Sequence, residues 1–343
     1  MNILITGNEG YIGPVLAEML MAKGHTIVGY DTEYFNGCEL LPYPTISRQI
    51  RKDIRDVNED DLQGIDVVMH LAGLSNDPLG ELNPTLTEQI NYRGTMLLAE
   101  AAKKAGVKRF IYSSSQSMYG ISDVGEELDE DDSEKNPITD YAKTKWRAEC
   151  ELKDMSSDDF SVTCLRPSTV FGAAPNLRCD IVYNNLVACA YTTGKIEIKS
   201  DGTPWRPVIH VQDTASSFIA CIEAPLELVK GESFNLGIEN GNYTVRDLAE
   251  AAQRAVPGCD LVFTGEHGND ARTYQVSFKK ILSQLKDYYK PQWNLDKGGV
   301  ELVEFFKKID LKEEDFRGAR CIRLMQINHL LEENTLDSNL RWS

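Results

Sequence analysis

The amino-acid sequence predicts an α/β fold in which a doubly wound parallel sheet carries a smaller C-terminal lobe. Short apolar strands alternate with helical stretches in the first half of the chain, and a glycine-rich turn directly follows the first strand. After about Arg166 the alternation loosens into shorter pieces rich in proline and glycine. We therefore expect a sheet domain over residues 1–166, a lobe mainly over residues 167–299 with segments that return to the sheet domain, and a helical arm over residues 300–343.

The first three elements have clear boundaries. Residues 2–6 form a β-branched, apolar run that suits a strand buried on both faces, and this run ends at Gly7. Residues 11–23 have a helical pattern that is closed by Gly24. The second strand, residues 25–30, is followed by Asp31.

Three further apolar runs predict strands over residues 67–71, 109–113 and 162–166. Helical stretches over residues 84–105 and 138–152 lie between them, so we expect the strands to run parallel. The last segment, residues 300–343, is helix-like and charged. Its pattern agrees both with a packed terminal arm and with a surface for a partner.

Composition narrows the class of protein. The formal charge of −17 at pH 7 opposes sustained contact with nucleic acid or an anionic membrane surface. The eight cysteines are scattered without CxxC pairs or Cys/His ligand spacing, which favours reduced thiols in a cytoplasmic protein and predicts no metal site. No apolar run approaches the ~20 residues that span a bilayer. We expect no cleaved signal peptide, because the first strand begins at once.

The turn after the first strand has the spacing GxxGxxG, with glycines at Gly7, Gly10 and Gly13. Without Cβ atoms, the backbone can approach a pyrophosphate at the N-terminus of the following helix, as in Rossmann-like domains. Asp31 can accept hydrogen bonds from both ribose hydroxyls of adenosine and would repel a 2′-phosphate, so NAD is favoured over NADP. Asp53 is either a contact to the adenine edge or a solvated loop acid.

Tyr141 and Lys145 lie one turn apart in a predicted helix. A tyrosine has a pKa of ~10, so it acts as a base near neutrality only if a positive charge such as that of Lys145 stabilises the phenolate. The spacing alone is weak, because 14 tyrosines and 20 lysines in 343 residues give roughly one such pair by chance. Tyr191 and Lys195 form a second pair, but Gly194 interrupts it and it lies beyond the sheet-forming half.

An apolar strand runs directly into the three serines at residues 113–115. Open α/β sheets bind ligands at the carboxyl ends of their central strands, so we expect Ser115 beside the same ligand as Tyr141. The predicted catalytic set is therefore Tyr141, Lys145 and Ser115.

Together these motifs resemble the extended short-chain dehydrogenase/reductase family, and within it the NAD-dependent nucleotide-sugar epimerases and dehydratases. The similarity covers nearly the whole chain. Its motifs are the glycine turn, Asp31, Asp53-Ile54, His70-Leu-Ala-Gly73, Asn91, Ser113-Ser-Ser115, Tyr119-Gly120, Tyr141/Lys145, Arg166-Pro-Ser-Thr-Val-Phe-Gly172, Arg206, Ile209-His-Val211, Asp213 and Asp270-Ala-Arg272.

The resemblance implies an NAD site in the sheet domain and a sugar site toward the smaller lobe. Residues expected to bind NAD are Gly7, Asn8, Glu9, Gly10, Tyr11, Ile12, Gly13, Asp31, Asp53, Ile54, Leu71, Ala72, Gly73, Asn91, Ser113, Tyr141, Lys145 and Pro167. Residues expected to bind a nucleotide-diphosphate sugar are Ser75, Ser115, Gln116, Ser117, Thr169, Arg178, Asn185, Arg206, Asp270 and Arg272. Arg206 and Arg272 are either clamps on the sugar nucleotide's pyrophosphate or surface ion pairs.

The resemblance also implies a reaction. In such enzymes the tyrosine takes the proton of a hexose C4 hydroxyl while NAD takes the C4 hydride, and the serine hydrogen-bonds the same oxygen. The family's 4,6-dehydratases carry an Asp-Glu pair directly after the catalytic Thr/Ser, where this chain has Gln116 and Ser117, which cannot supply that proton chemistry. The cysteine of the reductase/3,5-epimerase branch is missing there too. These departures favour a C4 epimerase, which needs no further acid.

Other interpretations stay open. Ser75 stands where glucose 4-epimerases often have a lysine, and Thr169 replaces a common asparagine, so either the sugar is unusual or a C4 dehydrogenase or 4,6-dehydratase releases the keto product. An alternative from a different class is a non-catalytic NAD-sensing protein that contacts a partner through residues 300–343. The resemblance further implies a homodimer joined through two helices of the sheet domain.

Overall fold

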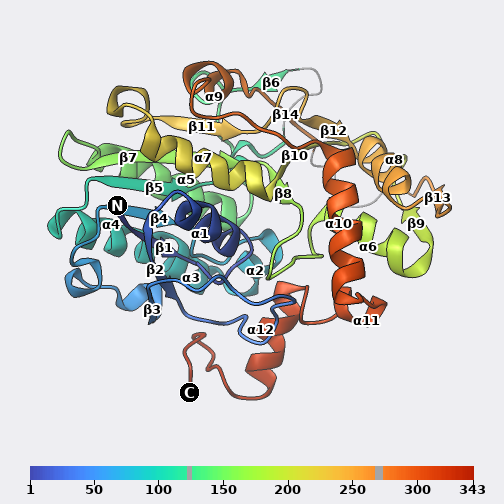
Figure 1. Cartoon of the computed structure of the whole chain (residues 1–343), viewed down its shortest axis with the longest axis horizontal. Coiled ribbons are helices and arrows are strands. Elements are labelled where there is room, and N and C mark those ends of the chain that lie inside the picture. Colours follow the sequence, from blue (N-terminus) through green and yellow to red (C-terminus); the bar gives the residue numbers. More distant parts are fainter. Residues whose placement is uncertain (122–125, 267–272) are drawn as a thin grey trace.

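The computed structural model describes residues 1–121, 126–266 and 273–343 (Figure 1). Its main sheet has seven parallel strands. From one edge to the other they are β3 (Arg48–Arg51), β2 (Thr26–Asp31), β1 (Asn2–Thr6), β4 (Val67–His70), β5 (Arg109–Ser113), β7 (Ser161–Pro167) and β11 (Ser233–Leu236). The direction of strand addition reverses between β1 and β4, as in a doubly wound sheet. The predicted fold class is confirmed.

The first strand and helix form as their residues predict. Ile3 and Leu4 of β1 are fully buried, because both faces of the sheet are covered. Helix α1 (Gly13–Ala22) has Pro14 in its first turn, where the missing N–H leaves no helical hydrogen bond unmade. The chain leaves the helix through Gly24, whose φ of +82° is costly for a residue with a side chain.

Helices cover both faces of the sheet. Helices α1 and α7 (Val211–Glu223) pack against one another on one face, and Leu16 and Phe218 share an apolar cluster there. Helices α4 (Gly94–Lys104) and α5 (Asp140–Met155) lie on the other face. Figure 1 shows α1 and α7 in front of the sheet and α5 behind it.

The helix predicted over residues 84–105 is divided in the structure. It consists of α3 (Pro84–Thr87), the π-helix η3 (Glu88–Arg93) and α4. Such π-turns are often found at functional sites. Here the turn contains Asn91, whose amide accepts from the Leu74 N–H at 2.7 Å and donates to the Leu74 carbonyl at 3.0 Å, so it shapes the loop after β4.

The smaller lobe is built around three helices that pack on one another, α6 (Val182–Thr193), α8 (Val245–Ala255) and α10 (Leu295–Ile309). It lies on the right of Figure 1, beyond the carboxyl ends of the main strands. The short strands outside the main sheet are β6 (Glu127–Leu128), β8 (Thr169–Phe171), β9 (Lys195–Ile198), β10 (Trp205–His210), β12 (Asn242–Thr244), β13 (Asp260–Phe263) and β14 (Gln275–Val276). The other short helices are η1 (Ile54–Asp56), η2 (Glu59–Leu62), α2 (Asp77–Leu82), η4 (Gln116–Tyr119), η5 (Leu226–Leu228) and α9 (Lys279–Gln284).

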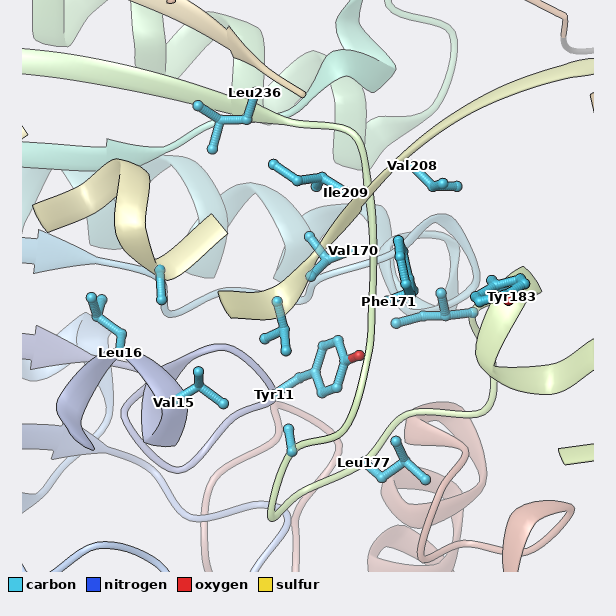
Figure 2. Packing of buried hydrophobic residues seen from close by; sticks show 14 of the residues in the cluster. Tyr11, Val15, Leu16, Val170, Phe171, Leu177, Tyr183, Val208, Ile209 and Leu236 are labelled. Atoms are coloured by element: carbon cyan, nitrogen blue, oxygen red, sulfur yellow. The ribbon is translucent and has the colours of Figure 1, made fainter. Parts of the chain in front are cut away.

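A continuous apolar core joins the lobe to the sheet domain. Figure 2 shows Tyr11 at this junction, between Val15 of α1 and the lobe residues Phe171 and Tyr183. The Tyr11 hydroxyl donates to the Gly172 carbonyl at 2.6 Å. The glycine-rich turn is therefore fixed to the lobe by its own side chain.

The C-terminal segment continues from α10 into α11 (Glu313–Phe316) and α12 (Arg323–Glu332), and it ends at the bottom of Figure 1. Its last residues pack on the loop after β2: the Trp342 indole donates to the Thr32 carbonyl at 2.6 Å, and the Tyr34 hydroxyl donates to the Leu340 carbonyl at 2.5 Å. Across the described ranges, no helix has the length and apolar character needed to cross a membrane.

Candidate functional site

A cleft of about 540 Å³ opens at the carboxyl ends of the main strands, where the strand order reverses. Its wall comes from the segments that follow β1, β2, β4, β5 and β7 and from the start of α5. Predicted site residues that line it are Gly7, Gly10, Tyr11, Ile12, Gly13, Asp31, Asp53, Ile54, Leu71, Ala72, Gly73, Ser75, Ser113, Ser115, Ser117, Tyr141, Lys145, Pro167, Thr169, Arg178 and Arg206. The fold thus gathers most of the two predicted sites in one cavity.

The glycine-rich turn fits a pyrophosphate. Gly7 has a φ of +72°, and a Cβ on it would lie 2.9 Å from the Ala72 nitrogen. A Cβ on Gly13 would lie 2.4 Å from the Gly7 carbonyl oxygen, so side chains are excluded at both ends of the turn. The backbone at the start of α1 is consequently open to a ligand phosphate.

Asp31 ends β2 at the edge of the cleft, where the adenosine ribose of NAD is expected. Its carboxylate accepts backbone N–H groups from Glu9 at 3.0 Å and from Glu33 at 2.8 Å. Burial raises the pKa of Asp31, while these two hydrogen bonds act in the opposite direction. The carboxylate is thereby held in place, and each oxygen keeps acceptor capacity for a ribose hydroxyl.

Tyr141 and Lys145 lie at the start of α5 and both line the cleft. Lys145 is buried, and its ammonium donates to the Ser113 carbonyl at 2.7 Å. The competing pair is not on one helical face, because α6 ends at Thr193 and Lys195 already belongs to β9. The structure therefore brings only the first of the two pairs into the cleft.

The electrostatics of this pair differ from the simple expectation. Burial raises the pKa of Tyr141, and a hydrogen bond with Ser115 only partly counters it. Burial also lowers the pKa of Lys145 to about 7. Since Lys145 is then only partly charged near neutrality, its field on the phenol is weaker than a full ammonium would give.

Of the three residues from Ser115 to Ser117, the two serines line the cleft and Gln116 does not. Ser115 caps η4, accepting the Ser117 N–H at 3.1 Å, and both serines line the cleft. Gln116 is buried, and its amide donates to the Arg166 carbonyl at 3.0 Å and the Leu236 carbonyl at 3.1 Å. The side chain at the position of the dehydratase acid is therefore used to tie the ends of β7 and β11.

The segment from Ser75 to Gly80 forms part of the cleft wall. The Ser75 hydroxyl lies 3.1 Å from the Arg178 guanidinium, which pairs with Asp180 at 2.8 Å. A Cβ on Gly80 would lie 2.9 Å from the Tyr141 Cβ, so α2 packs directly against the candidate catalytic residue. This segment links the catalytic helix to the smaller lobe.

Some predicted site residues do not line the cleft. These are Asn8, Glu9, Asn91, Gln116 and Asn185. The predicted residues Asp270 and Arg272 lie outside the described residues. Asn8 is bound to Gln49 at 2.9 Å, and Asn185 donates to the Cys179 carbonyl at 3.0 Å. Tyr11 faces the cleft with its backbone in the turn, because its side chain enters the core shown in Figure 2.

Several cleft residues were missed by the sequence analysis. Asn76, Asp77, Thr139, Asp180 and Arg323 belong to this group. The first two directly follow the predicted site residue Ser75, and the N-cap Thr139, which donates to Asp77 at 2.7 Å, precedes α5 directly. Arg323 carries no local signal, because only the folded chain places the C-terminal segment beside the cofactor end of the cleft. Within the described chain no cluster of three or more His, Cys, Asp or Glu side chains is arranged to hold a metal ion.

Comparison with known proteins agrees with this geometry. The model of the NAD dependent epimerase/dehydratase family matches residues 3–237. A UDP-glucose 4-epimerase of Bacillus subtilis is 30% identical over 291 residues, covering 74% of this chain and 82% of that protein. UDP-glucuronic acid decarboxylase 1 of Arabidopsis thaliana is 24% identical, with 93% and 72% covered.

Among solved structures, MoeE5 in complex with UDP-glucuronic acid and NAD is 26% identical, with a TM-score of 0.75. The match covers 90% of this chain and 99% of that one. The predicted resemblance is thus confirmed at the levels of sequence and of fold.

Proposed function

Because this chain belongs to the NAD dependent epimerase/dehydratase family, we propose that it is a nucleotide-sugar 4-epimerase that oxidises the hexose C4 hydroxyl to a transient 4-keto sugar. The observation that carries this choice is the environment of Gln116. A side chain without acid–base capacity occupies the position of the dehydratase acid, and its amide is bound to two backbone carbonyls. UDP-glucose 4-epimerases among the relatives support the same assignment.

The cofactor implied by the family, NAD, would accept a hydride from the sugar C4 and later return it. Tyr141 takes the proton of the C4 hydroxyl in the first half-reaction and gives it back to the C4 oxygen in the second. Ser115, next to Tyr141 in the cleft, donates a hydrogen bond to the same oxygen. Inversion follows when the keto sugar presents its opposite face before the hydride returns.

Lys145, one helical turn after Tyr141 in α5, supports the proton transfer. Its pKa of about 7 leaves it partly charged near neutrality, and the charged form stabilises the Tyr141 phenolate. Its hydrogen bond to the Ser113 carbonyl fixes the ammonium at the end of β5, beside the position expected for the nicotinamide ribose.

The substrate class is a nucleoside-diphosphate hexose. Thr169, the first residue of β8, and Arg206, the second residue of β10, line the lobe side of the cleft, where the sugar nucleotide would extend away from Tyr141. Arg206 provides a planar donor suited to a phosphate. The Ser75–Arg178–Asp180 contacts would then shape the sugar pocket itself.

The test is a panel of UDP-, dTDP-, GDP- and CDP-hexoses incubated with purified protein and NAD, with C4 inversion followed by NMR. We expect inversion with at least one of these donors, loss of it in Tyr141→Phe, and retention in the matched control Tyr191→Phe. The absence of C4 inversion with every donor would contradict the proposal.

A second candidate is an enzyme of the same family that releases a keto sugar, as a C4 dehydrogenase or a 4,6-dehydratase. It is favoured by Asp77, a carboxylate that lines the cleft. Burial raises the pKa of Tyr141 most, the Ser115 hydrogen bond lowers it, and the charge of Asp77 raises it by a smaller amount. Release of a keto product, or loss of water detected by mass spectrometry, would identify it. A non-catalytic NAD sensor would instead leave Tyr141→Phe without any measurable effect.

We further propose a cytoplasmic homodimer. All eight cysteines are free thiols, which suits a reducing compartment. Leu97 of α4 is 44% exposed on the face where two helices of the sheet domain would meet those of a second copy. Light scattering after size exclusion should give twice the 38.5 kDa chain mass.

A further inference from the structure

Arg323 is a buried cation at the first position of α12. Only 3% of it is exposed, and it lines the cleft. Its guanidinium lies 3.8 Å from the centre of the Phe35 ring and donates to the Asn176 carbonyl at 3.3 Å. Within residues 1–121, 126–266 and 273–343, no carboxylate lies within 4.0 Å of it. A buried charge in this state is costly and calls for an anionic partner.

The position of Arg323 along the cleft indicates which anion that is. Its charge lowers the pKa of Asp31 at the adenosine-ribose end. The charge of Arg178 lowers the pKa of Arg323 in turn, and it also lowers the pKa of Tyr141 at the catalytic end. The charge of Arg323 thus acts toward both ends of the expected dinucleotide, and its hydrogen bond to the Asn176 carbonyl places it beside the glycine-rich turn. In an NAD molecule that spans this distance, the pyrophosphate is the middle part.

Asn176 connects Arg323 to the glycine-rich turn. Its side-chain amide donates to the Glu9 carbonyl at 2.9 Å, while its own carbonyl accepts from Arg323. Arg323 is thus connected through Asn176 to the turn where the phosphates are expected. Two acids lie close to this position, Asp31 and Glu9; burial and then the charge of Asp31 raise the pKa of Glu9 to about 7, so that Glu9 is partly ionised near neutrality. A cation here would offset the repulsion between these acids and a phosphate.

Two other cations that line the cleft, Arg178 and Lys52, are already neutralised. Arg178 forms its ion pair with Asp180, and Lys52 pairs with Asp61 at 2.7 Å. Arg323 is held in place without such a pair, because α12 is fixed to the loop after β2 by a hydrogen bond from Gln326 to the Tyr34 carbonyl. Its geometry is consequently set before any phosphate binds, which lowers the entropy cost of binding.

We propose that Arg323 binds the pyrophosphate of NAD and that the part of the C-terminal arm after α10, residues 310–343, is thereby part of the cofactor site. The arm packs on Thr32 and Tyr34, which follow Asp31 at the adenosine end of the cleft. This inference rests on the cofactor of the family and not on the identity of the sugar. It is therefore tested separately from the epimerase assignment.

The test compares Arg323→Met with wild type and with Arg320→Met, a control at an exposed arginine of the same arm that bonds the Glu39 carbonyl. NAD retained on purification is measured after release from the protein, and nucleotide-free protein is titrated with NAD and with adenosine. We expect Arg323→Met to bind NAD about 10- to 100-fold more weakly, because a charge-assisted hydrogen bond is lost. Adenosine affinity should stay within about twofold.

Two further measurements separate binding from a purely structural role. Without nucleotide, Arg323→Met should melt no lower than wild type, because an apolar side chain replaces an unpaired buried charge. Arg323→Lys should recover part of the NAD affinity. The proposal is overturned if Arg323→Met binds NAD as tightly as wild type, if it weakens adenosine equally, or if Arg323→Lys is no better than Met.

Discussion

Removing the Tyr11 hydroxyl should separate the role of this side chain in the core from that of the turn at the cofactor cleft. In wild type the hydroxyl donates to the Gly172 carbonyl at 2.6 Å and accepts from the Asn184 amide at 3.0 Å. Tyr11→Phe leaves the carbonyl and one amide hydrogen without these partners at a buried site. Each of these two unsatisfied groups costs about 1–3 kcal/mol, so we expect a loss of about 2–6 kcal/mol of unfolding free energy.

The assay is urea unfolding of nucleotide-free protein, followed by circular dichroism. The midpoint should fall while the m-value stays unchanged, since the same surface is exposed on unfolding. Tyr92→Phe is the matched control, because the Tyr92 hydroxyl bonds Glu151 near the surface and its removal should cost under about 0.5 kcal/mol. If Tyr11→Phe were no more destabilised than Tyr92→Phe, the hydroxyl would not join the turn to the lobe.

Three other results are expected. Tyr141→Phe should lower kcat by about 10²–10⁴ while NAD still binds, as measured by steady-state kinetics and titration. Gly80→Ala should lower kcat without comparable loss of NAD affinity, since its Cβ would lie 2.9 Å from the Tyr141 Cβ; an unchanged kcat would show that α2 can shift freely. The pKa of Lys145 falls from 10.5 to about 7 on folding, so the folded state binds fewer protons and stability should rise between pH 7 and 10, by up to about 1.4 kcal/mol per pH unit. Lys145→Met should remove that rise in pH-dependent unfolding.

The sequence predicts best where local chemistry sets the structure. Gly7 and Gly24 delimit the first strand and helix because their positive φ values favour glycine, and the observed α1 agrees with the expected helix. The Tyr141 pair was separated from the Tyr191 pair by Gly194, which indeed ends α6 with a φ of +69°. In these cases the decisive residues are neighbours in the chain.

Prediction fails where contacts join distant parts of the chain. Nothing near Gln116 indicates that its amide would turn toward the Arg166 and Leu236 carbonyls instead of the cleft. The π-turn around Asn91 depends on its bonds to Leu74, 17 residues away in sequence. Arg323 is placed by the packing of the whole C-terminal segment, so a motif search centred on the glycine turn has no means of finding it.

The two chain ends differ in what can be attached to them. Met1 precedes β1 at the amino edge of the sheet, on the side away from the cleft, whereas Trp342 bonds the loop that carries Thr32. An affinity tag or fusion partner on the C-terminus would crowd the wall of the adenosine end, while one on the N-terminus would point away from it. For work with this protein, N-terminal fusions are therefore the safer design, and if Arg323 binds NAD as proposed, protein that has lost its C-terminal arm should carry less NAD.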